Sequence, residues 1–298
     1  MLPKSKWIKG LTAEEPYSQA ARRAVGQRLP LVWHYLPLAA ARHEENVEYV
    51  HQLRVATRRA AAAIEVFSEA LPRRRTEWMN RQLKRVRRAA AEARDLDVLA
   101  ARLSGEQNGY KEALDEITLR RVTAQEPIIK AYAKLEKMEF ALRADELAQR
   151  IRWRGDGSEP KLSKAARRYL KPISKRFIRQ SKADLSDMRE LHELRKDAKQ
   201  LRYAMELLAG ALDETFREDL YRSVEEIQAK LGTINDHHVA RNHFRRWARS
   251  SSSRRRAGCL EDLASKENDA MLIKADAFRG WFSTSRRSEF ETQLRKVR

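Results

Sequence analysis

Histidine, arginine and lysine recur at helical spacing in two short runs of the sequence. Their members are His51, Arg54 and Arg58 in the first run and His192, Arg195 and Lys199 in the second. On an ideal helix each run falls on a strip about 60° wide, and like charges stacked this way destabilise a helix by about 0.2–0.5 kcal/mol per pair. A chain of phosphates would offset this repulsion, because each guanidinium can donate two hydrogen bonds to phosphate oxygens. The two runs therefore predict a binding site for a polyanion.

The overall charge of the chain agrees with an acidic partner. The sequence holds 62 lysines and arginines against 42 aspartates and glutamates, which gives a formal charge of +20. A surface this basic attracts polyanions by long-range steering. Charge alone leaves nucleic acid, an anionic membrane and a phosphate polymer open, because each presents closely spaced anionic groups.

The two basic runs belong to a longer internal repeat. The segment VHQLRVATRRAAAAIEVFSEAL from Val50 resembles LHELRKDAKQLRYAMELLAGAL from Leu191, with an offset of 192 − 51 = 141. A second pair of segments aligns Asp95 with Asp236, and 236 − 95 is again 141. Two blocks that share one offset indicate a duplication.

Beside each basic strip runs a row of apolar residues spaced by three and four. The rows are Val50, Leu53, Thr57, Ala60, Ile64, Phe67 and Leu71 in the first copy and Leu191, Leu194, Ala198, Leu201, Met205, Leu208 and Leu212 in the second. This spacing predicts two helices that bury the same face inside a bundle. Thr57 is the polar exception.

The clearest break in the chain is GDGSEP at residues 155–160, with two glycines and a proline. We expect it to link a first helical half, residues 1–154, to a second, residues 161–298. Only 10 glycines and 8 prolines occur in 298 residues, which favours long helices. The predicted fold is all-α, with two four-helix bundles related by an internal pseudo-two-fold repeat. Pro127 and the run RSSSSRRR from Arg249 predict a further helix boundary and a surface loop.

Cysteine content and hydropathy bear on the cellular setting. Cys259 is the single cysteine, which excludes an internal disulfide, and the first residues lack the apolar stretch of a signal peptide. Charges interrupt every apolar window well before the roughly 18 residues that cross a bilayer. We expect a cytoplasmic protein that makes no membrane contact.

The HxLR-x3-[RK] pattern of both runs, the RDLDVL block and the lead-in WIKGL from Trp7 resemble the CHAD family, the conserved histidine α-helical domain. The resemblance extends over nearly the whole chain. It implies non-catalytic binding of inorganic polyphosphate in a basic groove between two helical halves, with association to polyphosphate granules as one role. We expect no cofactor, metal or obligate protein partner. Carried over position by position, the predicted binding residues are His51, Arg54, Arg58, Arg59, His192, Arg195, Lys199 and Arg202.

Secondary candidates for the same ligand lie near these positions. They are Lys84, Arg88, Arg94, Lys196 and Tyr203. The two halves are not equally basic, since Arg94 is answered by Asn235 and Lys84 by Glu225 at the common offset. We therefore expect the bound anion to contact the first half more than the second.

Two other classes of function remain open. A helical module that binds RNA or DNA would use the same phosphate contacts, but single-strand binders interleave aromatic residues with basic ones, and only Tyr203 lies on the strip. An enzyme of polyphosphate metabolism would need acidic residues that hold a divalent metal, and the strips hold none. Nucleic acid is the stronger alternative.

Several other polar residues suggest chemistry but have simpler interpretations. Asp95 and Asp236 are better explained as residues that orient a basic side chain or cap a turn than as catalytic carboxylates. His237, His238 and His243 suggest a metal site, yet adjacent histidines on a helix point about 100° apart. We expect structural roles at these positions.

The repeat makes an architectural prediction. When residues 20–150 are superposed on residues 161–291 in an experimental structure, His51 should align with His192. The reason is the offset of 141, which occurs in two separate blocks. A β-sheet in either half, or an alignment of His51 with another position, would contradict the duplication.

Overall fold

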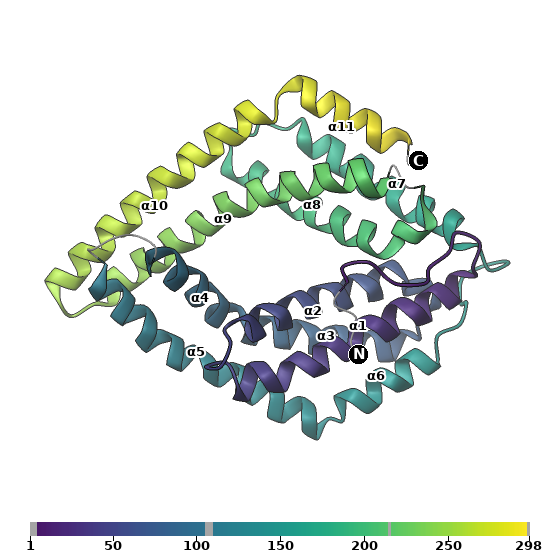
Figure 1. The fold of residues 1–298 in the computed structure, drawn as a ribbon, viewed down its shortest axis with the longest axis horizontal. Coiled ribbons are helices and arrows are strands. Elements are labelled where there is room, and N and C mark those ends of the chain that lie inside the picture. The colour runs from purple at the N-terminus through teal and green to yellow at the C-terminus, as the bar shows by residue number, and fades with distance from the viewer. Residues whose placement is uncertain (1–4, 105–109, 214–215, 297–298) are drawn as a thin grey trace. The chain divides into compact units, whose positions relative to one another are not determined.

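The computed structural model describes residues 5–104, 110–213 and 216–296, and most of these are helical (Figure 1). The α-helices are α1 (Tyr17–Ala41), α2 (Glu48–Val66), α3 (Arg73–Ala89), α4 (Ala91–Ser104), α5 (Lys111–Lys137), α6 (Phe140–Gln149), α7 (Leu162–Ser181), α8 (Met188–Leu208), α9 (Tyr221–Ser250), α10 (Arg254–Trp281) and α11 (Thr284–Lys296). Two 3₁₀ turns, η1 (Ser68–Ala70) and η2 (Ala209–Ala211), follow α2 and α8, and a π-helical turn, η3 (Phe216–Leu220), leads into α9. Within the described ranges no strand forms, which confirms the all-α prediction.

The chain packs as two compact units whose segments alternate along the sequence. Unit 1 comprises Met1–Asp97, Arg120–Tyr169 and Tyr203–Glu214, and unit 2 comprises Val98–Leu119, Leu170–Arg202 and Thr215–Arg298. The predicted halves, in contrast, are consecutive in sequence, because they follow from the internal sequence repeat and not from packing. The division at residues 155–160 therefore stays a prediction.

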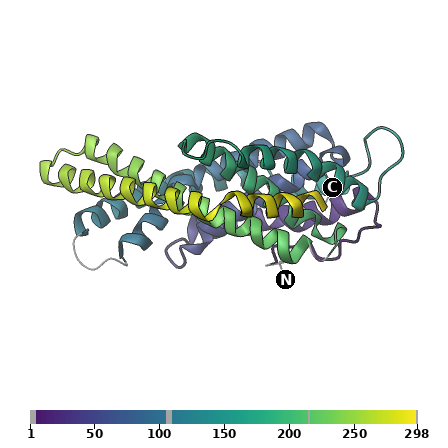
Figure 2. The same ribbon diagram turned by 90° about the horizontal axis from the view of Figure 1, so that it is seen from above.

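In unit 1, α1 and α2 lie side by side (Figures 1 and 2). The predicted apolar row of the first copy is completely buried, from Val50 to Leu71. Burial of each large aliphatic side chain contributes about 1.5–3 kcal/mol, so this row is what orients α2. Thr57 fits the row because its hydroxyl donates to the Arg54 carbonyl at 2.9 Å, which satisfies the polar group without water.

In unit 2, the long helices α9 and α10 run side by side (Figures 1 and 2). The part of α8 in this unit buries Leu191, Leu194, Ala198 and Leu201. The same face of α8 continues into unit 1, where Met205 and Leu208 are buried. Leu212 is only partly buried, so the second predicted row holds for six of its seven members.

The predicted breaks in the chain have mixed outcomes. Residues 155–160 lie in the helix-free stretch between α6 and α7, where Gly157 adopts a φ of +72° that disfavours other residues. The boundary predicted at Pro127 is wrong, since α5 continues through it with Ala124 and Ile128 buried on either side. The predicted loop after Arg249 shrinks to residues 251–253, and the Ser253 side chain caps α10 by accepting from the Arg256 amide at 3.3 Å.

The offset of 141 also appears in the order of elements. The 3₁₀ turns η1 and η2 start at Ser68 and Ala209, and 209 − 68 = 141. The next elements differ, because α3 and α4 are separate helices whereas α9 is continuous over the corresponding residues. The correspondence of elements at this offset therefore ends at the 3₁₀ turn.

An ion pair between α2 and the end of α8 lies inside unit 1. Arg59 Nε donates to Glu206 Oε2 at 2.8 Å, and the Glu206 side chain is only 1% exposed. Arg28, itself 1% exposed, is close enough to feel both groups: burial and the Arg59 charge lower its pKa to about 10, while Glu206 acts in the opposite direction. Glu206 therefore provides the negative charge for one buried arginine, Arg28, and one half-buried arginine, Arg59.

This arrangement predicts a large effect of Glu206→Ala on stability. Removal of the carboxylate leaves Arg59 and Arg28 without their common counter-charge in a buried site, and breaking such a pair costs about 3–5 kcal/mol. Thermal and urea unfolding followed by circular dichroism would measure the loss. The matched control on the same helix is Glu193→Ala, because Glu193 is exposed and pairs with exposed Lys196 at 2.9 Å. The control should change stability by about 0.5 kcal/mol or less; equal effects would contradict the buried-pair interpretation.

Candidate polyanion-binding site

In unit 1, basic side chains from three helices form a cluster. The cluster comprises His51, Arg54 and Arg58 from α2, Arg87 and Arg88 from α3, and Arg94 from α4. The buried apolar row of α2 fixes the rotation of that helix, so the basic strip beside it turns towards α3 and α4. Arg54 Nη1 donates to the Arg87 carbonyl in the last turn of α3 at 3.2 Å, where carbonyls lack an intrahelical partner.

The electrostatics of this cluster show mutual repulsion between cations. The pKa of Arg54 is lowered to about 10, first by burial and then by Arg58, with Arg94 and Arg87 adding to the effect and Asp95 opposing it. The pKa of Arg87 is also lowered, by burial and then by Arg58 and Arg88. A lowered arginine pKa means that the folded protein disfavours the charged form. The cluster is thus a site of excess positive charge.

His51 responds to the same field. Its pKa lies below the usual 6.5, because burial disfavours the imidazolium and because Arg94, Arg58 and Arg54 repel it, while Glu48 has the opposite effect. His51 is therefore mostly neutral at pH 7. A neutral imidazole can still donate a hydrogen bond to a phosphate oxygen, and an approaching anion would raise its pKa.

The remaining predicted residues of unit 1 lie in different surroundings. Arg59 is turned away from its neighbour Arg58 and bonds to buried Glu206, so the structure assigns it a packing role, and its predicted contact with a ligand stays untested. Lys84 is exposed on α3. Tyr203, at the start of the α8 segment in this unit, is close enough to Arg87 to oppose the lowering of its pKa.

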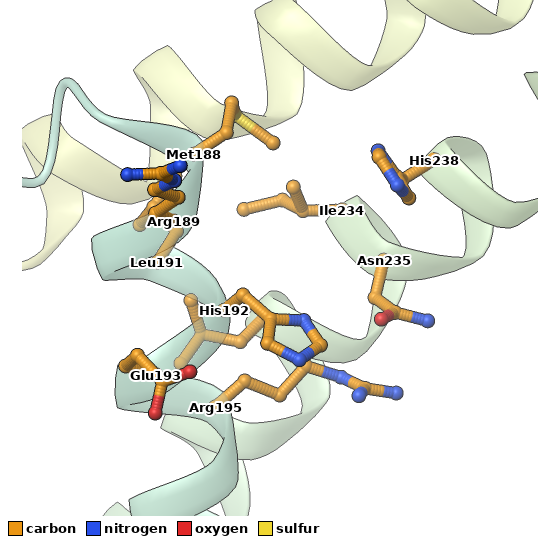
Figure 3. Close-up of a pocket in the computed structure, with 10 residues that line it drawn as sticks. Met188, Arg189, Leu191, His192, Glu193, Arg195, Ile234, Asn235 and His238 are labelled. Carbon is orange, nitrogen blue, oxygen red and sulfur yellow. The ribbon is translucent and has the colours of Figure 1, made fainter.

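In unit 2, α8 carries His192, Arg195, Lys199 and Arg202 at successive helical turns. His192 and Arg195 line a pocket of about 280 Å³ between α8 and α9, together with Asn235 and His238 from α9 (Figure 3). Burial and the charges of Arg241 and His192 lower the pKa of His238. The basic row of α8 thus begins at a preformed hollow.

Acidic residues partly neutralise the basic residues of α8. Lys196 donates to Glu193 at 2.9 Å, and Arg202 Nη1 lies 4.0 Å from Glu225 Oε1 on α9. Glu225 stands at the position that Lys84 has in the first half, since 225 − 84 = 141. The stronger excess of positive charge therefore lies in unit 1, as the comparison of the two sequence blocks predicts.

Sequence reasoning missed three residues that the structure places at these sites. Arg87 is not among the predicted residues, which include Lys84 and Arg88 of the same helix, although it faces Arg58 and Arg54. Its spacing of three from Lys84 and seven from Arg94 would have suggested it. Asn235 and His238 also lie one turn apart, but only the packing of α9 against α8 reveals that they face His192 (Figure 3).

The residues considered for metal binding have other contacts. His237 Nδ1 lies 2.6 Å from Glu267 Oε2, and Arg102 donates to the same carboxylate at 2.5 Å. These contacts tie α4, α9 and α10 together inside unit 2. Over the described ranges, no group of three or more histidine, cysteine or acidic side chains has the arrangement of a metal site. Nor does any described helix have the length and apolarity to cross a membrane.

Comparisons with known proteins cover most of the chain. The family model of the CHAD domain matches residues 32–245. The fold is similar to the crystal structure of the CHAD domain from the plant Ricinus communis, with a TM-score of 0.71 and 20% identity over 94% of this chain and 96% of that one. It is also similar to PptA from Streptomyces chartreusis, with a TM-score of 0.60 and 19% identity over 89% and 98% of the two chains. A search of curated proteins found no match.

The lowered pKa of His51 can be measured by a proton NMR titration of the imidazole signals. We expect His51 to titrate below 6.5, and the Arg94→Ala variant to move its pKa upwards, because Arg94 is the charge that lowers it most. The unfolded chain binds the proton more readily than the folded one, so His51 should reduce stability as the pH falls below about 6.5. A His51 pKa above 6.5, or one unchanged by Arg94→Ala, would contradict the cluster.

Proposed function

Because the chain belongs to the CHAD family, we propose that it binds inorganic polyphosphate along its basic residues and does so without catalysis. The observation that carries the proposal is the cluster of Arg54, Arg58, Arg87 and Arg94, in which burial and like charges lower the pKa of Arg54 to about 10. Such a cluster is unfavourable alone and becomes favourable when anions are bound. The ligand therefore has to supply several negative charges close together.

A linear phosphate polymer matches the geometry of these rows. Residues four apart on a helix are about 6 Å apart along its axis, so Arg54 and Arg58, or Arg195 and Lys199, form a ladder of cations. Each guanidinium can hold phosphate oxygens through paired hydrogen bonds, and each phosphate of the polymer presents the same oxygens to the next cation. Because all units of the polymer are identical, its binding site needs no side chains that distinguish one unit from another.

The surroundings of the rows support binding without catalysis. Phosphoryl transfer to water normally uses a divalent metal held by carboxylates. Two carboxylates on α8 are engaged by cations of the protein: Glu193 by Lys196, and Asp197 by Arg176 at 2.7 Å. In the proposal these acids orient the basic side chains, and the polymer leaves the site unchanged. Association with polyphosphate granules in the cytoplasm is the corresponding cellular role.

Nucleic acid is the alternative ligand, and the tryptophans argue against it. Binders of single strands stack bases on accessible aromatic rings. Here Trp247 is 1% exposed, Trp33 stacks with Phe140, and Trp281 stacks with Phe282. These three rings thus pack against or within the helices, whereas the basic rows offer phosphate contacts.

A competition titration distinguishes the two ligands. A fluorescent long-chain polyphosphate bound to the protein would be displaced by unlabelled polyphosphate, RNA or DNA at matched phosphate concentration and salt. We expect polyphosphate to displace the probe at a concentration at least tenfold lower than either nucleic acid. Equal or stronger displacement by RNA or DNA would overturn the proposal in favour of the alternative.

The double variant Arg54→Ala, Arg195→Ala tests the basic rows directly. We expect affinity for polyphosphate to fall at least tenfold and the slope of log affinity against log salt to become shallower, because fewer counterions are released. Thermal stability should stay unchanged or rise, since relief of repulsion offsets loss of the Arg54 bond to the Arg87 carbonyl.

The control removes the same charge elsewhere. Lys137 on α5 and Lys274 on α10 are exposed and lie one in each unit, so Lys137→Ala, Lys274→Ala matches the charge change. If this control loses as much affinity as the arginine variant, binding depends on net charge and not on the rows. Unfolding of the arginine variant would show instead that Arg54 and Arg195 are structural.

A further inference from the structure

The pocket in unit 2 has a composition that inorganic polyphosphate alone does not require. Its apolar lining comes from Met188 and Leu191 of α8 and from Leu231 and Ile234 of α9. Its rim carries polar and basic groups from the same two helices, with His192 and Arg195 facing Asn235 and His238 (Figure 3). Pockets for small molecules typically combine such an apolar lining with a few convergent polar groups.

The first half lacks the features that form this pocket. At the offset of 141, Leu231 and Ile234 are answered by Ala90 and Ala93, and Asn235 by Arg94. Arg94 belongs to the cation cluster of unit 1, where it lowers the pKa of His51. In unit 2 the short amide of Asn235 replaces that long cation, and larger apolar side chains replace the two alanines. At the same place the second half therefore has an apolar surface where the first half has a cation.

These groups suit the base of a purine nucleotide. The pocket volume of about 280 Å³ is near the lower end of the range for small ligands, which fits one planar ring system. Histidine rings can stack on a base, and an asparagine amide offers the donor and acceptor that pair with N7 and the amino group of adenine. The acidic rim residue Glu193 is held by Lys196 at 2.9 Å, so it does not oppose an anion with its full charge.

The row beyond the pocket suits the phosphates of the same ligand. Arg195 lies on the pocket rim, and Lys199 and Arg202 follow on α8 over about 10 Å along the helix axis. We infer that unit 2 binds an adenosine polyphosphate, with the adenine in the pocket between α8 and α9 and the phosphates along Arg195, Lys199 and Arg202. This inference rests on the proposed function, because it uses the same phosphate-binding row.

Isothermal titration of the full chain with ATP, tripolyphosphate and adenosine tests the inference. ATP carries one ionisable oxygen fewer than tripolyphosphate, so charge alone predicts that ATP binds more weakly. Stacking of one base contributes enough to reverse this order, and we expect ATP to bind about tenfold more tightly than tripolyphosphate. ATP binding equal to or weaker than that of tripolyphosphate would overturn the inference.

The variant Asn235→Arg places in the second half the residue that the first half has. The arginine should fill the pocket and add a cation, so the advantage of ATP should disappear while tripolyphosphate binds as well as before or better. His238→Ala, checked for native helicity by circular dichroism, should weaken ATP and leave tripolyphosphate unchanged. If both variants keep the preference for ATP, the adenine lies elsewhere and the inference fails.

If long polyphosphate binds to the native chain and ATP does not, the inference alone fails. If neither long polyphosphate nor tripolyphosphate binds, the proposed function fails as well.

Discussion

Repulsion between partly buried guanidinium groups is the constraint on which the rest of this structure depends. Arg54 and Arg87 are held near Arg58 although burial and like charges disfavour their ionised forms. An isolated helix with this strip would be weakened, and its side chains would turn away from one another. The buried row from Val50 to Leu71 prevents this, because a rotation of α2 that separated the cations would expose its apolar face. Hydrophobic burial thus maintains a charge arrangement that a bound anion would relax.

Much of the fold could be predicted from periodicity, since the apolar rows of α2 and α8 follow from spacing alone. Thr57 shows how a polar residue is accommodated in such a row, through its bond to the Arg54 carbonyl. The fate of Arg59 could not be predicted, because its partner Glu206 lies 147 residues away and only tertiary packing brings the two together. The helix boundary predicted at Pro127 is wrong for a related reason. Residues of α5 on both sides of Pro127 are buried, and this packing outweighs the backbone hydrogen bond that proline cannot donate.

The candidate site was less predictable than the fold. The basic strips are local features and can be found by their spacing. The pKa shifts of His51 and Arg54, and the inclusion of Arg87, depend on how α3 and α4 pack against α2. The pocket of unit 2 depends in turn on differences between the halves, such as Asn235 at the position of Arg94. In the sequence this difference indicates only a lower charge, and the packing of α9 beside α8 shows that Asn235 lines a pocket. Of the two segments related by the offset of 141, one is more basic and the other lines the pocket.

The packing of α1 has a consequence for how fragments of such proteins are chosen. The family match begins at residue 32, whereas α1 begins at Tyr17 and buries residues along its whole length. Tyr17 donates to the Val66 carbonyl at 2.6 Å, and buried Arg28 donates to the Ser5 carbonyl at 3.1 Å. A recombinant fragment cut at the ends of the recognisable family segment would expose the inner face of α2 and separate Glu206 from Arg28. The segment that matches the family model is therefore shorter than the segment whose packing buries the inner face of α2.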